Sequence, residues 1–233
     1  ELPHGNTQSS VMQKLILFDF DGTLADTAPD LAAAANTMRV QKGLEPLPYD
    51  VLRPMASQGA RGLLKASLEL EPEHPEYEAH RVRFLSEYEK QMTTLTQLFP
   101  GIPELLATLK AEGFKWGIVT NKVEYLAVPI VRHLQLEAEC AVTVGGDTAG
   151  HAKPHPAPLL YAAEKTGFQP EDCIYVGDDE RDIVAGKAAG MPTIAAAYGY
   201  CQVDDIPRWN ADAVVDSAHE IWPAVQALLQ RVA

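Results

Sequence analysis

Short apolar runs alternate with longer segments of helical periodicity, and this alternation constrains the fold more than any other feature. The apolar runs are LILF (15–18), WGIVT (116–120), AVTV (141–144), CIYV (173–176) and PTIAAA (192–197). Helical patterns occupy residues 102–112, 123–134, 155–167, 180–189 and 218–230. Strands separated by amphipathic helices predict βαβ crossovers. We therefore expect an α/β fold with a doubly wound parallel sheet covered by helices on both faces.

One interval breaks this regular alternation. Residues 19–115 separate the first two apolar runs, whereas a crossover needs only a dozen or more residues. Helical patterns at 29–43, 59–70 and 75–92 fill the interval, separated by proline-rich turns. We expect an inserted all-helical domain, with a core on either side of it and a disordered leader or expression remnant in front. The expected bounds are 1–11 for the leader, 12–27 and 96–233 for the core, and 28–95 for the helical insert.

The amino-acid composition argues against some classes of binding partner. The chain has 19 Lys and Arg against 32 Asp and Glu, a formal net charge of -13, and we find no basic patch, so nucleic acid is not an expected partner. No apolar stretch approaches the ~20 residues that span a bilayer, so no membrane is expected. Three widely spaced cysteines, Cys140, Cys173 and Cys201, do not indicate a disulfide framework. We expect a cytoplasmic protein that is a monomer or homodimer.

Polar side chains follow four of the predicted strands, where an open parallel sheet places its ligand site. These residues are Asp19 and Asp21; Thr120, Asn121 and Lys122; Lys153; and Asp178, Asp179 and Asp182. Carboxylates gathered at one edge raise one another's pKa, so we expect a bound cation to relieve the repulsion. Because the ligands are oxygen atoms, Mg²⁺ together with a substrate phosphate is the expected combination.

The residue types also predict a division of roles. Lys153 and the backbone N–H groups near Asn121 are suited to hold phosphate oxygens. Asp19 and Asp21 lie two residues apart in an extended segment, so they point to the same side and can address one phosphate. One would be a nucleophile able to form an aspartyl-phosphate, and the other a general acid and base.

Four motifs together resemble the haloacid dehalogenase superfamily of Mg²⁺-dependent phosphatases. DFDGT (19–23) is similar to its D-x-D-G-T motif, and Thr120 to its strand-ending Ser or Thr. KPHP (153–156) is similar to K-P-x-P, and GDDERD (177–182) to a final motif of G-D with a further Asp four positions later. The resemblance spans residues 15–197 and implies a Rossmann-like core.

The resemblance also assigns roles in phosphoryl transfer. It implies that Asp19 attacks phosphorus, while Asp21 protonates the leaving oxygen and later activates water. Thr120 and Lys153 would bind the phosphoryl oxygens, with Lys153 also steadying Asp19.

The remaining motif residues concern the metal and the turn. The resemblance implies that Mg²⁺ is held by the Asp19 carboxylate, the Asp21 backbone carbonyl and the Asp178 carboxylate. Asp182 would support this set, as would Asp179, which stands where many relatives have Ser. Gly22 and Thr23 would shape the turn.

An insert directly after the first motif resembles the helical cap of the members that act on small metabolites, so we expect the insert to govern substrate choice. In ASQGARGLL (56–64), Arg61 would present a guanidinium to the substrate. The stretch is similar to the cap loop of phosphoglycolate phosphatases and to the Ser-x-Gly-Ala-Arg of relatives that hydrolyse N-acetylmuramic acid 6-phosphate. The expected partner is a small anionic phosphorylated metabolite.

Several alternatives stay open at this stage. The same motifs fit a sugar phosphomutase of the superfamily, and the fold alone also admits a non-catalytic phosphometabolite-binding protein. Arg61 is equally typical of a surface ion pair. His151 and His155, on either side of Lys153, fit solvated loop residues better than metal ligands.

Overall fold

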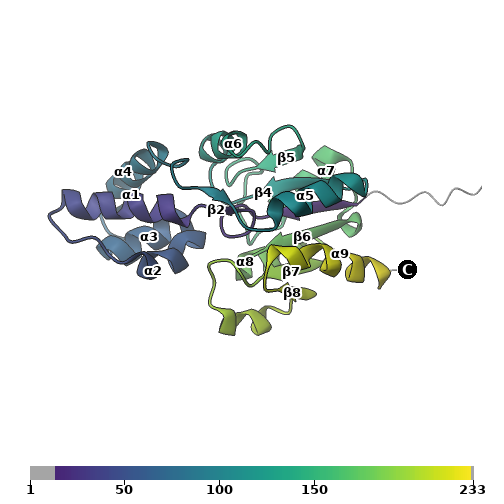
Figure 1. Cartoon of the computed structure of the whole chain (residues 1–233). Coiled ribbons are helices and arrows are strands. Elements are labelled where there is room, and N and C mark those ends of the chain that lie inside the picture. The colour runs from purple at the N-terminus through teal and green to yellow at the C-terminus, as the bar shows by residue number, and fades with distance from the viewer. Residues whose placement is uncertain (1–13, 232–233) are drawn as a thin grey trace, which may run out of the picture.

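Six parallel strands form the centre of the protein in a computed structural model that describes residues 14–231 (Figure 1). The strand order is β5-β4-β1-β6-β7-β8. The strands are β1 (Leu15–Phe18), β4 (Lys115–Val119), β5 (Cys140–Val144), β6 (Cys173–Gly177), β7 (Thr193–Ala196) and β8 (Ala213–Val215). The order runs outward from β1 in both directions, so polar residues that follow β1, β4 and β6 meet at one edge. The expectation of a leader at 1–11 lies outside the described residues.

Helices cover both faces of the sheet, as expected for a doubly wound fold. They are α5 (Ile102–Ala111), α6 (Glu124–His133), α7 (Ala157–Thr166), α8 (Glu180–Ala188) and α9 (Ile221–Gln230). Alternate side chains of β1 enter two separate apolar clusters. Ile16 and Phe18 pack in the cluster that includes residues of α5 and α9, and Leu15 and Leu17 in the one that includes residues of α7 and α8. Every residue of β1 is fully buried.

A helical insert leaves and re-enters the core through a short antiparallel pair, β2 (Ala25–Asp26) and β3 (Gln97–Leu98). Between them lie α1 (Ala28–Gln41), α2 (Tyr49–Leu52), a 3₁₀ turn (Arg53–Gln58), α3 (Gly59–Leu68) and α4 (Tyr77–Glu89). Helix α1 packs against α3 and α4, with Leu31, Met38 and Phe84 buried among them. Figure 1 shows these helices as a group beyond the end of the sheet. They fall within the 28–95 segment predicted to be helical.

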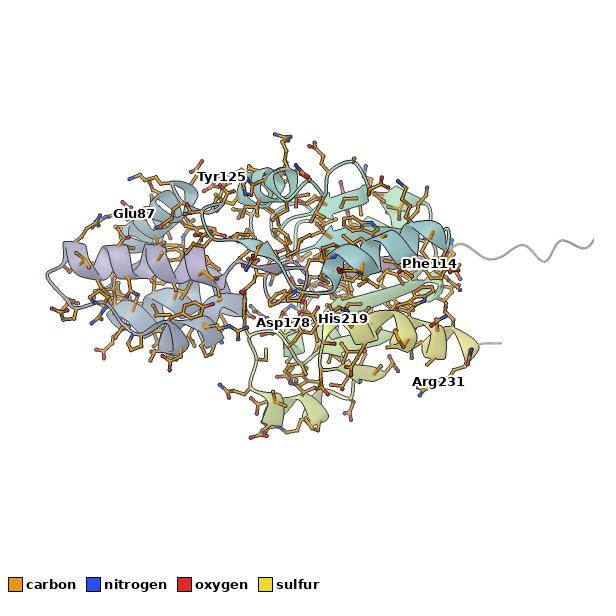
Figure 2. The ribbon with its side chains drawn as sticks, viewed as in Figure 1. Glu87, Phe114, Tyr125, Asp178, His219 and Arg231 are labelled. Atoms are coloured by element: carbon orange, nitrogen blue, oxygen red, sulfur yellow. The ribbon has the colours of Figure 1, made fainter. Side chains whose placement is uncertain are left out.

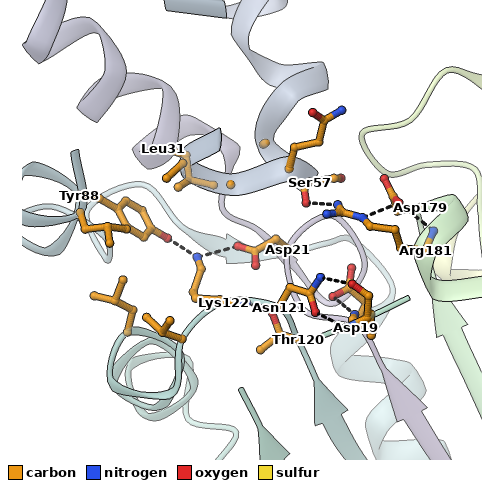
Figure 3. A pocket seen from close by; sticks show the side chains of 18 of the residues that line it. Asp19, Asp21, Leu31, Ser57, Tyr88, Thr120, Asn121, Lys122, Asp179 and Arg181 are labelled. Atoms are coloured by element: carbon orange, nitrogen blue, oxygen red, sulfur yellow. Dashed lines mark hydrogen bonds and ion pairs between the residues drawn. The ribbon is translucent and has the colours of Figure 1, made fainter. Parts of the chain in front are cut away.

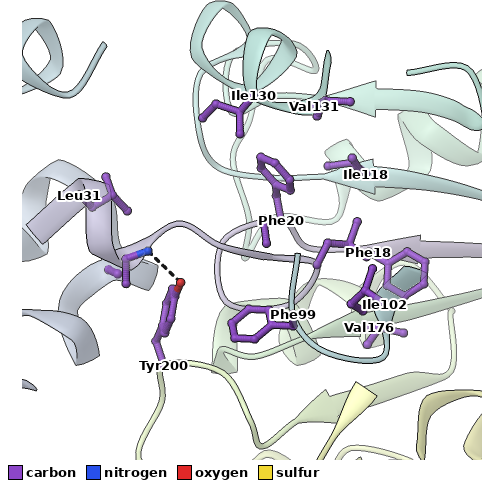
Figure 4. Close-up of a cluster of buried hydrophobic side chains, with 14 of the residues drawn as sticks. Phe18, Phe20, Leu31, Phe99, Ile102, Ile118, Ile130, Val131, Val176 and Tyr200 are labelled. Carbon is purple, nitrogen blue, oxygen red and sulfur yellow. Dashed lines mark hydrogen bonds between the residues drawn. The ribbon is translucent and has the colours of Figure 1, made fainter. Parts of the chain in front are cut away.

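The junction between insert and core is packed with aromatic side chains (Figure 4). Phe99 lies edge-on to Tyr198, with ring centroids 5.1 Å apart, and Tyr200 is 2% exposed. The Tyr200 hydroxyl accepts a hydrogen bond from the Ala28 backbone N–H at 2.9 Å and donates one to Asp26 at 2.7 Å. The loop after β7 therefore fixes the first residues of the insert.

Some elements differ from the sequence expectation. The short strand β8 has only three residues and was not predicted, nor was the β2–β3 pair. The predicted helix at 218–230 begins as a 3₁₀ turn (Ala218–Glu220) and becomes α-helical from Ile221. Within residues 14–231 we find no helix with the length and hydrophobicity needed to cross a membrane.

Candidate active site

The four sequence motifs meet at the carboxyl edge of the sheet, in a cavity of about 210 Å³ between the sheet and the insert (Figure 3). Strand register explains the meeting: Phe18, the last residue of β1, lies beside Ile118 of β4 and Val176 of β6. The residues that follow these three strands therefore emerge together. Of the expected site residues, those lining the cavity are Asp19, Asp21, Thr120, Asn121, Lys153, Asp179 and Asp182.

Lys153 is the centre of the buried polar network. Its Nζ donates to Asp19 Oδ1 at 3.0 Å, Asp182 Oδ1 at 2.7 Å, Tyr175 Oη at 2.6 Å and the Val119 carbonyl at 2.9 Å. Burial opposes the charge of the ammonium, but the two carboxylates outweigh it and raise the pKa of Lys153. The lysine therefore stays charged and fixes the Asp19 carboxylate at the end of β1.

Asp19, Asp178 and Asp182 form a buried carboxylate cluster, with one oxygen of each within 4.8 Å of the others. Burial, and next the charge of Asp182, raise the pKa of Asp19 well above its ordinary value and that of Asp178 to about 6. Such repulsion between hard oxygen donors is what a divalent cation relieves. The donor set therefore fits a metal ion. Asp178 lies between the sheet and the insert (Figure 2).

Asp182 differs from the other two members because both its oxygens already have partners. Oδ1 accepts from Lys153 and from the Tyr175 hydroxyl at 3.1 Å, and Oδ2 accepts from the Asp179 backbone N–H at 3.1 Å. Asp179 in turn caps α8, accepting from the Arg181 backbone N–H at 2.9 Å. Both residues hold the loop after β6 in place, an arrangement compatible with the supporting roles predicted from the sequence.

Gly22 and Thr23 form a tight turn against the cluster. Gly22 has a φ of +86°, and a Cβ at this position would lie 2.3 Å from Asp178 Oδ2, so only glycine fits. Thr23 Oγ1 lies 3.4 Å from Asp178 Oδ1 as a long hydrogen-bond donor. The turn thus allows the first and fourth motifs to touch.

Asn121 joins the second and third motifs. Its side-chain amide donates to the Lys153 carbonyl at 2.9 Å and its oxygen accepts from the Lys153 backbone N–H at 2.8 Å. The neighbouring Thr120 is 2% exposed, and its Oγ1 accepts from the Lys122 backbone N–H at 3.1 Å. Asn121 therefore positions the lysine loop.

Two residues that sequence reasoning gave no role, Lys122 and Tyr88, hold Asp21. Lys122 Nζ donates to Asp21 Oδ1 at 2.7 Å and to the Tyr88 hydroxyl of α4 at 2.6 Å (Figure 3). Burial opposes the charge of Lys122, but Asp21 and Tyr88 outweigh it and raise the pKa. Burial also raises the pKa of Tyr88, to about 12. The position of Lys122 directly after Thr120 and Asn121 could have predicted that this lysine lies at the site. Nothing in the sequence around Tyr88 predicts that it does.

The insert also reaches the carboxylate cluster through Ser57. Its hydroxyl donates to Asp178 Oδ2 at 2.9 Å, and its carbonyl accepts from Arg181 Nη2 at 2.5 Å. Sequence reasoning gave no role to Ser57 or Arg181, although Ser57 opens the Ser-x-Gly-Ala-Arg stretch and Arg181 lies within GDDERD (177–182). They lie next to predicted residues, but only the folded chain brings the 3₁₀ turn of the insert to α8.

Arg61 is placed differently from the expectation that it faces the substrate. It is exposed on α3 and lines a second hollow, of about 950 Å³, together with Lys65 and Glu71. Arg61 is not among the residues that line the cavity of Asp19, whereas Arg81 and Arg181 are. The turn 56–60 reaches the site through Ser57 instead.

Known proteins are similar to this chain in sequence. A sequence model of haloacid dehalogenase-like hydrolases matches residues 16–196. The phosphoglycolate phosphatase of Xanthomonas campestris pv. campestris (strain 8004) is 45% identical over 210 residues, covering 90% of this chain and 95% of the relative. The N-acetylmuramic acid 6-phosphate phosphatase of Pseudomonas aeruginosa is 41% identical over 209 residues, covering 89% and 92%.

A solved structure has a similar fold. The crystal structure of a predicted phosphoglycolate phosphatase from Haemophilus somnus 129pt superposes with a TM-score of 0.80 at 29% identity, covering 91% of this chain and 98% of that one. Both the fold and the sequence are similar along most of the chain. The protein belongs to the haloacid dehalogenase-like hydrolase family.

Proposed function

We propose that this protein is a phosphatase that hydrolyses the phosphate monoester of a small metabolite through an aspartyl-phosphate on Asp19. The observation that carries the proposal is the Asp19 carboxylate at the end of β1, fixed by Lys153 at 3.0 Å and facing a cavity. Both relatives described above are named as phosphatases. A non-catalytic role is disfavoured because a binding protein has no need of a buried, mutually repelling carboxylate cluster.

The first half of the reaction transfers the phosphoryl group to the protein. Asp19 attacks phosphorus, a new O–P bond forms, and the bond to the substrate's alcohol oxygen breaks. Asp21, held by Lys122 and Thr27, gives its proton to that oxygen, so the alcohol leaves neutral. Thr120 and the Lys153 ammonium bind the phosphoryl oxygens and offset their charge.

Water completes the cycle. Asp21 now takes a proton from a water molecule as the water attacks the phosphorus of the aspartyl-phosphate. The Asp19–phosphorus bond breaks, inorganic phosphate leaves, and Asp21 is again protonated. One pair of carboxylates two residues apart thus serves both half-reactions.

The proposed metal is Mg²⁺. Asp19 and Asp178 would hold it with their carboxylates and Asp21 with its backbone carbonyl, while Asp182 and Asp179 keep the loop after β6 in position. When bound, the ion neutralises the charge shared by the carboxylates and the phosphoryl oxygens. We place the reaction in the cytoplasm and assign residues 28–95 the role of a cap, on a core of 12–27 and 96–233 that acts as a monomer or homodimer.

Phosphate release from a panel of esters tests the proposal. The panel contains phosphoglycolate, N-acetylmuramic acid 6-phosphate and glucose 6-phosphate, each with Mg²⁺ and with EDTA. We expect inorganic phosphate from at least one ester, only with the divalent ion. Isomerised sugar phosphate without released phosphate would identify a phosphomutase instead, and binding without any turnover would contradict an enzymatic function.

A further inference from the structure

The insert directly contacts one of the proposed metal ligands. Ser57 lies in the 3₁₀ turn that precedes α3, and its hydroxyl donates a hydrogen bond to Asp178 Oδ2 at 2.9 Å. The backbone N–H of Tyr200 donates to the same oxygen at 3.0 Å. One oxygen of the Asp178 carboxylate therefore has two donors, one from the core and one from the insert.

The same oxygen is also enclosed by backbone. A Cβ at Gly22 would lie 2.3 Å from Asp178 Oδ2, and a Cβ at Gly199 would lie 2.6 Å from it. Two glycine backbones and two hydrogen-bond donors thus surround Oδ2. The other oxygen, Oδ1, is less engaged: among the residues that the structure describes, its hydrogen-bond donor is Thr23, at the long distance of 3.4 Å. Oδ1 is therefore the oxygen of Asp178 that remains for a metal ion.

A ring of contacts holds Ser57 in this position. Its carbonyl accepts from Arg181 Nη2 at 2.5 Å, and Arg181 Nε donates to Asp179 Oδ1 at 2.9 Å (Figure 3). Asp179 directly follows Asp178, so the chain closes the ring at the carboxylate that Ser57 contacts. The neighbouring Ala56 is only 3% exposed, which anchors the turn within the insert. Both the backbone and the side chain of Ser57 are therefore fixed against the loop after β6.

We infer that Ser57 is a positioning residue for the metal site: it holds Oδ2 of Asp178 and so keeps Oδ1 available for the ion. The affinity for the ion then depends on the insert as well as on the sheet edge. The inference rests on the Mg²⁺ site of the function proposed above and adds to it a residue from outside the four motifs. Hydrogen-bond partners of a metal-binding carboxylate fix its orientation, and their loss costs roughly 10–100-fold in metal affinity. Because such coupling is reciprocal, the bound ion should also hold the turn of the insert against the core.

Binding of Mn²⁺ alone tests the inference without any turnover. Mn²⁺ takes the same kinds of oxygen ligand as Mg²⁺, and electron paramagnetic resonance measures the free ion during a titration. We expect Ser57→Ala to weaken Mn²⁺ binding about tenfold, and Ser57→Thr, which keeps the hydroxyl, to stay within about twofold of wild type. Ser86→Ala is the matched control, because Ser86 is exposed on α4 of the insert. It should bind Mn²⁺ as wild type does.

Amide hydrogen exchange tests the reciprocal effect. Mg²⁺ should slow the exchange of residues 53–62 in wild type by up to about tenfold, because the ion stabilises the contact between the turn and Asp178. This slowing should be lost in Ser57→Ala and kept in Ser57→Thr. A slowing of equal size in Ser57→Ala, or none in wild type, would overturn the inference.

The remaining outcomes separate this inference from the proposed function. Equal Mn²⁺ affinity in Ser57→Ala and wild type would overturn the inference, and so would tighter binding, which would show that Ser57 competes with the ion. Phosphate release from the ester panel would support the phosphatase function in either case. Absence of Mn²⁺ binding to wild type would refute the metal site and the inference together. The expected loss of affinity in Ser57→Ala, without phosphate release from any ester, would refute the phosphatase function and leave the role of Ser57 intact.

Discussion

The sheet edge and the helical insert face each other across one cavity, but they place polar groups in different ways. At the edge, Lys153 alone makes four hydrogen bonds, and Asp19, Asp178 and Asp182 are crowded despite their repulsion. The insert contributes apolar side chains and a few polar ones, among them Gln58 and Arg81. Its Ser57 hydroxyl donates to Asp178, and its Tyr88 hydroxyl accepts from Lys122. In the function proposed above, the edge carries out the reaction and the insert selects the alcohol.

Asp19→Asn should have the largest effect on the reaction at the sheet edge. We expect phosphate release to fall at least about a thousandfold, because the amide cannot act as the nucleophile. In metal-free protein the melting temperature should stay constant or rise, since one of the repelling charges is removed. Phosphate release and thermal unfolding measure the two effects. The control is Asp216→Asn, which changes an exposed carboxylate; retained turnover in Asp19→Asn would refute the catalytic assignment.

Lys153→Met should have the next largest effect, on stability as well as activity. The variant leaves Asp19 and Asp182 buried without their cation, so we expect the free energy of unfolding to fall by about 3–5 kcal/mol. Urea unfolding of metal-free protein measures it. The exposed Lys165→Met serves as control and should change stability by less than about 0.5 kcal/mol. A loss no larger than the control's would mean that the edge does not depend on this pairing.

The stability of metal-free protein should depend on pH because Asp178 is crowded by other carboxylates. The folded-state pKa is about 6 and the ordinary value is 3.8, so between these values the folded state binds the proton more tightly. The contribution of Asp178 to stability is therefore fully present below about pH 4 and is lost as pH rises to 6. Thermal unfolding in EDTA should show this decline in wild type but not in Asp178→Asn, and Mg²⁺ should stabilise most at neutral pH. Equal pH slopes for the two proteins would contradict the assignment.

Arg61→Ala should have the smallest effect. The side chain is exposed and lines the hollow beyond α3, so we expect kcat/KM to stay within about twofold of wild type on every ester. Steady-state kinetics on the ester panel checks this. A selective loss on one ester would show that Arg61 reaches the substrate and that the insert contributes a cation to selection.

The sequence predicts the edge far better than the insert, for a physical reason. Asp19, Thr120 and Asp178 stand at or just after the ends of apolar runs, and parallel pairing brings such ends together whatever lies between them. Arg61 shows what the sequence does not predict. Its neighbours predict a turn followed by a helix, which the structure confirms. They do not predict which side of that helix meets the core.

Contacts between the insert and the edge escaped prediction for the same reason. Tyr88 lies more than thirty residues from Lys122 in the chain and has the sequence pattern of an ordinary helix residue. Ser57 opens the Ser-x-Gly-Ala-Arg stretch, but that stretch does not predict its contact with Asp178. The strand β8 was missed because it has only three residues and no amphipathic pattern. Such contacts depend on tertiary packing, which local sequence patterns do not specify.

The β2–β3 pair has a consequence for how proteins of this kind diversify. Because the insert departs and returns through two adjacent strands, Ala25 opposite Leu98 and Asp26 opposite Gln97, its ends are neighbours in space. A different helical segment could be joined at the same two points without altering the register of β1 with β4 or β6. With the roles proposed above, recombination at this junction would exchange one substrate selectivity for another and keep the reaction, so the pair is a suitable junction for chimeric enzymes.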